Sequence, residues 1–187
     1  ADAGTYLYAY HNNFGNIGQT SINITGNSQL PSFLKAGNNP SGQQNYVNTF
    51  NKSGIGISCL GDVRTTIYQN DFSNCDEDAI VIAKNFSKQI DVLRNTIDNC
   101  HNGISMWDIT TPQQITIDSN IISGGLDARG IPSNLHGIDL YNGFTYKIPL
   151  QITRNRITDY PYGIRLMNVW VNNSFVVADN QVSFNFS

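Results

Sequence analysis

Residues 92–106 read Val-Leu-Arg-Asn-Thr-Ile-Asp-Asn-Cys-His-Asn-Gly-Ile-Ser-Met, and they contain both halves of a repeat that decides the fold. The first half is centred on Asn95, with an apolar residue three positions before it and another two positions after it. The second half has Cys100 five residues after the asparagine. It then continues, eight residues after the asparagine, with a glycine-apolar-any-apolar segment that begins at Gly103.

The first half of this repeat recurs along the chain. Further copies are centred on Asn70, Asn120, Asn155 and Asn180, with weaker copies around Asn12 and Asn48. Successive asparagines are 36, 22, 25, 25, 35 and 25 residues apart, so the basic period is about 25. The two long intervals predict insertions near residues 26–45 and 124–135. Such insertions normally project from one face of a repeat protein.

Two repeat folds place an asparagine at this offset. A leucine-rich repeat would continue with a helical segment, whereas here polar turn residues and a second alternating apolar segment follow each asparagine. No segment has a sustained 3.6-residue apolar period. We therefore predict an all-β fold, a right-handed parallel β-helix of about seven coils. Residues 1–187 are expected to form one domain, a segment of a longer solenoid.

The inward side chains of one coil are buried only when another coil stacks on it, at a spacing of about 4.8 Å. We expect Ile67, Val92 and Ile117 to lie in one such aliphatic stack. The asparagines are interpreted as scaffold residues that occupy a tight left-handed turn and hydrogen-bond to one another. Cys75 and Cys100 occupy the same repeat position, and a Cβ separation of about 4.8 Å is wide for a disulfide. Buried free thiols are therefore expected.

The repeat resembles the right-handed β-helix repeat family, which includes pectate-lyase-like enzymes, alginate-modifying β-helices and bacteriophage tailspikes. The resemblance covers about Ala9 to Val182. It implies that the glycine-apolar-any-apolar segments form the first sheet, whose outer face commonly carries the saccharide groove. The Asp-Pro-His motif of alginate epimerases and the motif set of polygalacturonases are absent. The resemblance therefore predicts the fold and leaves the reaction open.

Composition narrows the classes of partner. The net charge is −3 and 13% of the residues are charged, so the basic face of a nucleic-acid-binding protein is not expected. No apolar run reaches the roughly 18–20 residues that cross a bilayer. Low charge with many neutral polar residues is typical of extracellular β-rich proteins. We therefore expect a location outside the cell, on a cell surface or on a virion, for a processed chain or a piece of a longer one.

Strand alternation predicts which side chains face outward from the first sheet. Ile104 and Met106 are expected to face inward, so the residues that alternate with them face outward. The equivalent outward residues of three adjacent coils are expected to lie close together on the outer face. The expected substrate-binding residues are Ser105, Trp107, Tyr141, Tyr162 and, from an insertion, Arg129. The expected catalytic residues are Asp108, His136, Asp139 and Arg165.

Aromatic rings pack on pyranose faces while charged groups bind hydroxyls or uronate carboxylates, so a polysaccharide or glycan is the expected partner. If the protein is an enzyme, a glycoside hydrolase would use Asp108 and Asp139 as its carboxylate pair. A polysaccharide lyase would use His136 or Tyr141 as base and Arg165 as the cation. The alternative is that Asp139 and Arg165 form only an ion pair and that Trp107 covers an insertion.

Two further expectations concern other parts of the chain. The acidic run Asp76-Glu77-Asp78 is read as a solvated turn or a calcium site, and no other cofactor is expected. Residues 183–187 do not read as a cap, so the open ends are expected to carry further coils or to self-associate. The alternative to a carbohydrate-binding or carbohydrate-processing protein is a non-catalytic structural or adhesive solenoid.

Overall fold

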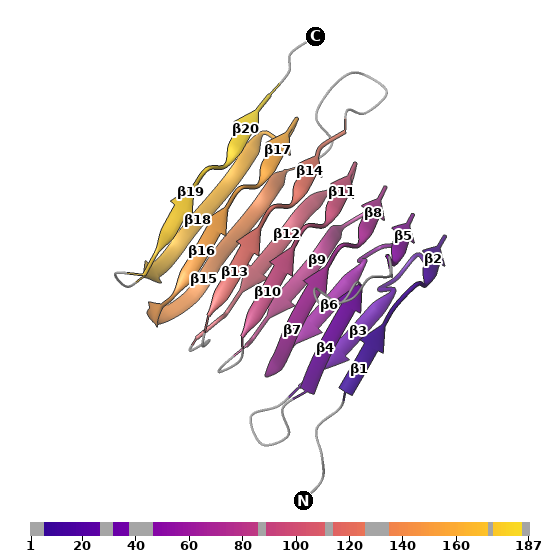
Figure 1. Ribbon diagram of the computed structural model, residues 1–187, viewed down its shortest axis with the longest axis horizontal. Coiled ribbons are helices and arrows are strands. Elements are labelled where there is room, and N and C mark those ends of the chain that lie inside the picture. Colours follow the sequence, from indigo (N-terminus) through magenta and orange to yellow (C-terminus); the bar gives the residue numbers. More distant parts are fainter. Residues whose placement is uncertain are drawn as a thin grey trace, which may run out of the picture.

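The structure is a computed structural model, and it describes residues 6–26, 32–37, 47–85, 89–110, 114–125, 135–171 and 174–184. Within these ranges the side chains of residues 143–148 and 170–171 are not described. The described residues form twenty β-strands and no helix, and the strands belong to three parallel sheets (Figure 1). The predicted all-β parallel solenoid is thus confirmed.

The strands follow one another in a fixed rotation through the three sheets. Sheet A contains β1 (Tyr6–Ala9), β4 (Ser32–Gly37), β7 (Val63–Tyr68), β10 (Ile90–Leu93), β13 (Ile115–Asp118), β16 (Leu150–Thr153) and β19 (Val176–Ala178). Sheet B contains β2 (Asn13–Gly15), β5 (Thr49–Asn51), β8 (Asp71–Ser73), β11 (Thr96–Asp98), β14 (Ile121–Ser123), β17 (Arg156–Thr158) and β20 (Gln181–Ser183). Sheet C contains β3 (Ile22–Thr25), β6 (Ile57–Leu60), β9 (Asp78–Ala83), β12 (Asn102–Trp107), β15 (His136–Ile148) and β18 (Tyr162–Val171).

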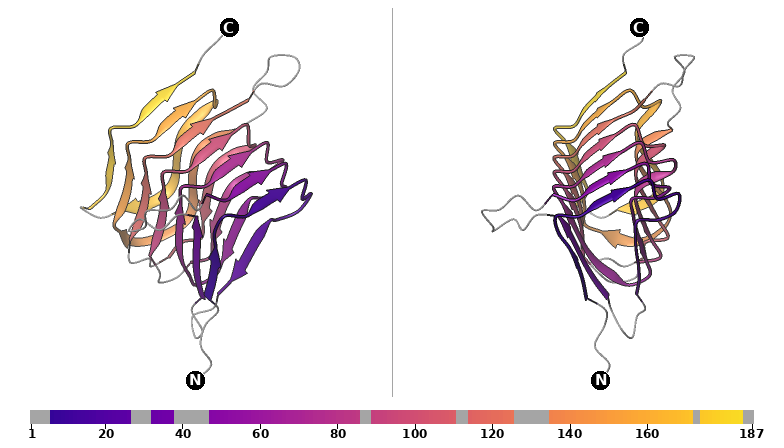
Figure 2. Two further views of the ribbon diagram at one scale, coloured as in Figure 1. Left: turned by 45° about the vertical axis from the view of Figure 1, so that its right-hand side comes forward. Right: turned by 90° about the vertical axis from the view of Figure 1, so that its right-hand side faces the viewer.

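One strand from each sheet makes one coil, and about seven coils stack along the molecule (Figure 2). The pairing keeps the repeat in register. Val92 of β10 is opposite Ile67 on one side and Ile117 on the other. Ile97 of β11 likewise lies between Phe72 and Ile122. Equivalent repeat positions therefore form columns that run the length of the stack.

The inward columns form one continuous hydrophobic core. The predicted aliphatic stack of Ile67, Val92 and Ile117 is fully buried. In sheet B the column begins with aromatic rings, since Phe50 stacks on Phe72 with ring centroids 4.6 Å apart. Aliphatic and aromatic side chains at fixed repeat positions thus exclude water from the interior of every central coil.

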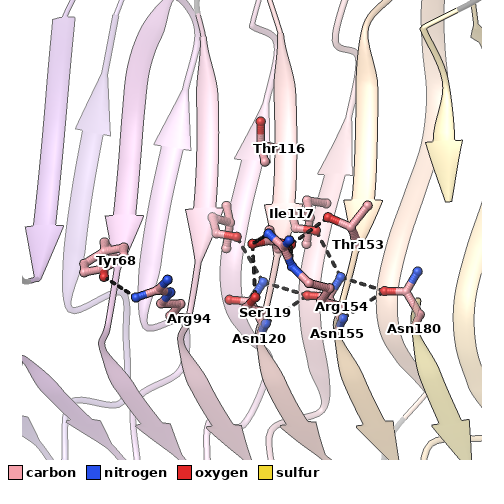
Figure 3. Close-up of polar contacts among 12 residues, drawn as sticks. Tyr68, Arg94, Thr116, Ile117, Ser119, Asn120, Thr153, Arg154, Asn155 and Asn180 are labelled. Carbon is pink, nitrogen blue, oxygen red and sulfur yellow. Dashed lines mark hydrogen bonds and ion pairs between the residues drawn. The ribbon is translucent and has the colours of Figure 1, made fainter. Parts of the chain in front are cut away.

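The asparagines form the predicted ladder along the corner between sheets A and B (Figure 3). Asn95 donates its backbone N–H and one Nδ2–H to Oδ1 of Asn120, each at 3.0 Å. Its other Nδ2–H bonds to the carbonyl of Ile67 at 3.0 Å. The same three bonds are made by Asn70, Asn120 and Asn155. These buried amides are therefore scaffold, as predicted.

The backbone at this corner differs from the expectation in one respect. The left-handed residue is the one before the asparagine, as at Arg94 (φ 53°) and Ser119 (φ 56°), and the ladder asparagines themselves are not left-handed. Turning the chain one residue earlier leaves each asparagine amide pointing along the stack, where it reaches the next coil. The prediction of a left-handed asparagine was wrong for that reason.

The structure also bears on the predicted insertions and on the predicted free thiols. Residues 32–37, inside the insertion predicted near 26–45, form β4 of sheet A, so the extra length lies on either side of that strand. Most of the insertion predicted near 124–135 lies outside the described residues. Cys75 and Cys100 are buried free thiols, as predicted, and the Cys75 N–H points at the sulfur of Cys100, 3.4 Å away.

Candidate functional site

Sheet C brings the predicted site residues together on its outer face. In register, Ser105 of β12 lies opposite Asp139 of β15, which lies opposite Arg165 of β18. Two parallel columns flank this one. The first contains Asn102, His136 and Tyr162, and the second contains Trp107, Tyr141 and Met167. Ile104 and Met106, predicted to face inward, are fully buried in the core. We call the outward residues of these three columns the sheet C face.

An ion pair stands at the centre of the sheet C face. Arg165 donates from Nε to Oδ1 of Asp139 at 2.7 Å and from Nη2 to Oδ2 at 2.5 Å. The Asp139 side chain is only 5% exposed, whereas that of Arg165 is 36% exposed. Paired hydrogen bonds of this kind fix both groups in one orientation. The ion pair weighed in the sequence is therefore formed, with a buried carboxylate and a guanidinium that reaches solvent.

His136 lies beside this pair and is hydrogen-bonded to Asn102. Its backbone N–H donates to Oδ1 of Asn102 at 3.1 Å, and its Nδ1 lies 3.3 Å from the same oxygen. Because an amide oxygen only accepts, Nδ1 carries the proton and Nε2 keeps a lone pair. Nε2 is buried without a hydrogen-bond partner. Burial lowers the pKa of His136; the nearby Asp139 carboxylate opposes this shift, and the Arg165 charge adds to it.

Aromatic rings lie on both sides of the ion pair. Trp107 stacks on Tyr141 with centroids 5.7 Å apart, and His136 stacks on Tyr162 with centroids 5.1 Å apart. The guanidinium of Arg165 lies 5.7 Å from the centre of the Tyr141 ring. Tyr162 is 58% exposed, so much of its ring is open to solvent. The face thus offers flat apolar surfaces around a fixed charged centre.

Ser105 has a partner that the sequence reasoning did not assign to the site. Its hydroxyl donates to Oδ1 of Asp78 at 2.5 Å, and the serine is almost fully buried. Burial raises the pKa of Asp78, although the hydrogen bonds from Ser105 and Asn102 oppose the rise. Asp78 is opposite Asn102, which is opposite His136. The sequence reasoning missed Asp78 and Asn102 as site residues. Both occupy the repeat position just before the glycine, which is also the position of His136. That shared position was the signal that could have identified them.

Two predicted residues do not join the central group. Asp108 follows β12 in a left-handed conformation (φ 53°), and its N–H donates to the carbonyl of Asn142 at 2.7 Å. The register partner of Asp139 is Ser105, three residues before Asp108. That offset is about 10 Å along a strand. Arg129 lies outside the described residues.

The calcium alternative for the acidic run Asp76-Glu77-Asp78 finds no supporting cluster. Within the part of the chain that the structure describes, no three histidine, cysteine or acidic side chains are placed to hold a metal ion, and this includes Asp76, Glu77 and Asp78. The same part of the chain has no helix of the length and apolarity that spanning a membrane requires. The carboxylate of Asp78 instead serves the hydrogen bond with Ser105.

A separate hollow lies on the outer face of sheet A. It measures about 360 Å³, and its lining includes Tyr8, Phe33, Lys35, Arg64 and Asp91. This hollow shares no residue with the sheet C face, so ligand binding at the two places is separable by mutation.

Comparison with known proteins adds no assignment to either place, since no family model, curated protein or solved structure matches the chain.

Proposed function

We propose that this β-helix binds a polysaccharide or glycan on the sheet C face and acts outside the cell. The observation that carries the proposal is the arrangement of two ring stacks around one charged centre. Trp107 and Tyr141 lie on one side of Asp139 and Arg165, and His136 and Tyr162 lie on the other. Sugars present both apolar ring faces and hydroxyl groups, and this face offers a partner for each.

The charged centre favours an acidic sugar. A guanidinium has five N–H donors, and two of those of Arg165 are engaged by Asp139. Because the Arg165 side chain is partly exposed, its remaining donors are available to a uronate carboxylate or to hydroxyls. Asp139 keeps the guanidinium fixed before a ligand arrives, which lowers the entropy lost on binding.

Processing of the bound polymer is the finer form of this proposal, in line with the resemblance to pectate-lyase-like proteins and tailspikes. His136 is the better base, because its neutral Nε2 carries a lone pair and no hydrogen bond. Tyr162 stacks on the His136 ring, and movement of Tyr162 is the proposed way of exposing that atom. A hydrolase needs carboxylates about 5–9.5 Å apart. Asp108 and Asp139 are offset by three residues along the strand and by one coil, so their backbone separation exceeds what a hydrolase pair needs. Lyase chemistry is therefore the better candidate.

The test is a glycan-array and depolymerisation screen with acidic and neutral oligosaccharides. We expect Tyr162→Ala and Trp107→Ala each to weaken binding of an oligouronate by up to about tenfold, since ring stacking contributes about 0.5–1.5 kcal/mol. Arg64→Ala, in the sheet A hollow, is the matched control and should bind as the unmodified chain does. Loss of binding in the control alone would move the site to sheet A and reject the sheet C face.

The second candidate is a structural or adhesive solenoid segment. It is favoured by the fact that the charged and aromatic side chains of the sheet C face bind one another between adjacent coils. Asp139 and Arg165 belong to β15 and β18, and Trp107 and Tyr141 to β12 and β15. Such contacts stabilise a rod without any ligand. If no glycan binds the unmodified chain while Tyr162→Ala and Trp107→Ala lower its melting temperature, the structural role is the correct one.

A further inference from the structure

The hollow on the outer face of sheet A is carried by four adjacent strands, β1, β4, β7 and β10 (Figure 1). Its volume of about 360 Å³ lies within the roughly 300–1,000 Å³ of small-ligand sites. Most of its lining belongs to strands that are paired on both sides, namely Phe33, Leu34, Lys35, Arg64, Thr66, Asp91 and Leu93. The hollow is therefore a feature of the sheet surface and is not formed by the edge of an end strand.

Aromatic rings from β1 and β4 form one side of the hollow. Phe33 lies opposite Tyr6, and their rings are stacked with centroids 4.7 Å apart and planes 3° from parallel. This contact holds the Phe33 ring, which lines the hollow, in one orientation. Tyr8 also lines the hollow and lies two residues beyond Tyr6 on β1. The two lining rings provide flat apolar surface for a ligand that has an apolar ring face.

Polar groups from β7 and β10 form the other side, and a chain of hydrogen bonds holds them. Arg64 donates from Nη2 to Oε1 of Gln89 at 3.3 Å, and Gln89 donates from Nε2 to Oδ2 of Asp91 at 2.8 Å. Thr116, directly opposite Asp91 on β13, also hydrogen-bonds to this carboxylate. The Gln89 amide thus fixes the orientation of two charged side chains that both line the hollow.

This arrangement differs from the ion pair of the sheet C face, where Arg165 binds Asp139 directly through two hydrogen bonds. In the part of the chain that the structure describes, no ion pair joins Arg64 to Asp91, and Gln89 bridges them instead. A guanidinium has five N–H donors and a carboxylate accepts about four hydrogen bonds. The contacts with Gln89 and Thr116 use only part of this capacity, so the hollow offers a fixed donor and a fixed acceptor as separate groups.

The charges around the hollow favour a ligand that is rich in hydroxyls and carries no charge. Asp91 is half-buried, and burial raises the pKa of its carboxyl, although hydrogen bonds from Thr116 and Gln89 and the Arg64 charge oppose the rise. A ligand hydroxyl that donates to this carboxylate would stabilise it, whereas a ligand carboxylate placed beside it would be repelled. Asp91 also offsets part of the positive charge of Lys35 and Arg64, so the hollow has no strong attraction for an anion.

We propose that the sheet A hollow is a second binding site of this protein and that its ligand is a neutral sugar. One pyranose ring lies against Phe33 and Tyr8. Its hydroxyls donate to Asp91 and accept from Arg64, and these two contacts fix the orientation of the sugar. The proposal is independent of the sheet C face, and it holds or fails whether or not that face binds an acidic polymer.

The test uses a set of neutral trisaccharides, namely cellotriose, laminaritriose, maltotriose, mannotriose and galactotriose, with trigalacturonate as the acidic comparator. Isothermal titration calorimetry measures their binding to the unmodified chain. We expect at least one neutral trisaccharide to bind with one-to-one stoichiometry. Binding of none of them would overturn the proposal. Trigalacturonate binding that is lost in the hollow variants below would also overturn it, because the ligand class would then be acidic.

Substitutions in the hollow assign the binding to it. Asp91→Ala removes the acceptor and should weaken binding of that trisaccharide by about tenfold. Tyr8→Ala should weaken binding about three- to tenfold, whereas Tyr8→Phe keeps the ring and should bind as the unmodified chain does. Thermal unfolding shows which variants are folded, and the two Tyr8 variants decide the outcome if Asp91→Ala does not fold.

Tyr162→Ala, on the sheet C face, is the matched control and should leave binding of the neutral trisaccharide unchanged. Arg64→Ala should weaken that binding by about tenfold and leave trigalacturonate binding as it is. Neutral-sugar binding that is lost in Tyr162→Ala but kept in Asp91→Ala and Tyr8→Ala would reject the hollow. Failure of the sheet C face is read separately, because it appears only as the absence of trigalacturonate binding.

Discussion

Asp139 and Arg165 lie directly opposite each other on β15 and β18, and two hydrogen bonds of 2.7 and 2.5 Å join a buried carboxylate to a partly exposed guanidinium. Removing the guanidinium alone would leave the carboxylate buried without its partner. Arg165→Met should therefore lower the unfolding free energy by about 2 kcal/mol.

A double-mutant cycle in urea distinguishes this pairing energy from lost packing. The variant Asp139→Asn combined with Arg165→Met should be destabilised by less than the sum of the two single changes, because no unpaired charge remains. Strict additivity would show that the two groups do not interact in solution.

The asparagine ladder should be more sensitive in its middle than at its end. Asn120→Ala removes the acceptor of two Asn95 donors in a fully buried corner, so we expect a loss of about 3 kcal/mol or more. Asn180→Ala makes the same chemical change where the corner is half-buried and should cost clearly less. Thermal or urea unfolding of both variants provides the comparison, and equal losses would contradict a ladder that depends on burial.

Two aspartates should give opposite dependences of stability on pH. For Asp118, burial disfavours the charge, but hydrogen bonds from Arg154, Thr153 and Ser119 outweigh it and lower the pKa. A carboxyl whose pKa falls on folding stabilises the protein above its unfolded pKa of about 3.9, and this contribution is lost as the pH falls through the folded value. Asp118→Asn should therefore be less stable than the parent at pH 7 and nearly equal to it near pH 2.

Asp78 provides the converse case within the same fold. Its pKa is raised chiefly by burial, so ionisation at neutral pH opposes folding. Asp78→Asn keeps an oxygen for the Ser105 hydroxyl and removes the charge, and it should be more stable than the parent at pH 7. The difference should shrink as the pH drops below about 4, where the unfolded carboxyl is protonated as well. Urea midpoints at several pH values test both variants, and a shared sign would refute the assignment.

The proton on His136 should reside on Nδ1 at neutral pH. Asn102 Oδ1 accepts at that nitrogen, and burial lowers the pKa of the ring. Nitrogen-15 NMR of the imidazole should show a protonated Nδ1 and a bare Nε2 at pH 7, with the charged form appearing only below the usual range near 6.5. Asn102→Leu should weaken this tautomer preference. A predominant Nε2–H signal in the parent would remove His136 as a candidate base.

The sequence was sufficient for the coils and for most of the outward face. Fixed spacings from each asparagine placed Ser105, Trp107, Asp139 and Arg165 on one face, because strand alternation is a local property that an unbroken repeat preserves. The strand β4 escaped recognition because residues 38–46 separate it from Asn48, so no apolar residue stands three positions before that asparagine.

The burial of outward-facing side chains could not be predicted from the alternation pattern of a single strand. Ser105 and Asp139 point away from the core, yet both are almost fully buried, and both are hydrogen-bonded to side chains of neighbouring coils: Ser105 to Asp78, and Asp139 to Arg165. Whether an outward residue meets water depends on what the repeat places one coil above and below it. That comparison needs the register of the sheets as well as the alternation within one strand.

The uniform direction of the asparagine amides also bears on how such a molecule changes length over evolutionary time. A duplication or deletion of one whole coil leaves every remaining amide facing a correct acceptor, and coils of different length are tolerated as well, because the amide bonds persist across the intervals of 22 and 35 residues. Reach could therefore be tuned in steps of about 4.8 Å. Each added coil would lengthen the molecule by a fixed amount and would leave the side chains displayed by the other coils unchanged.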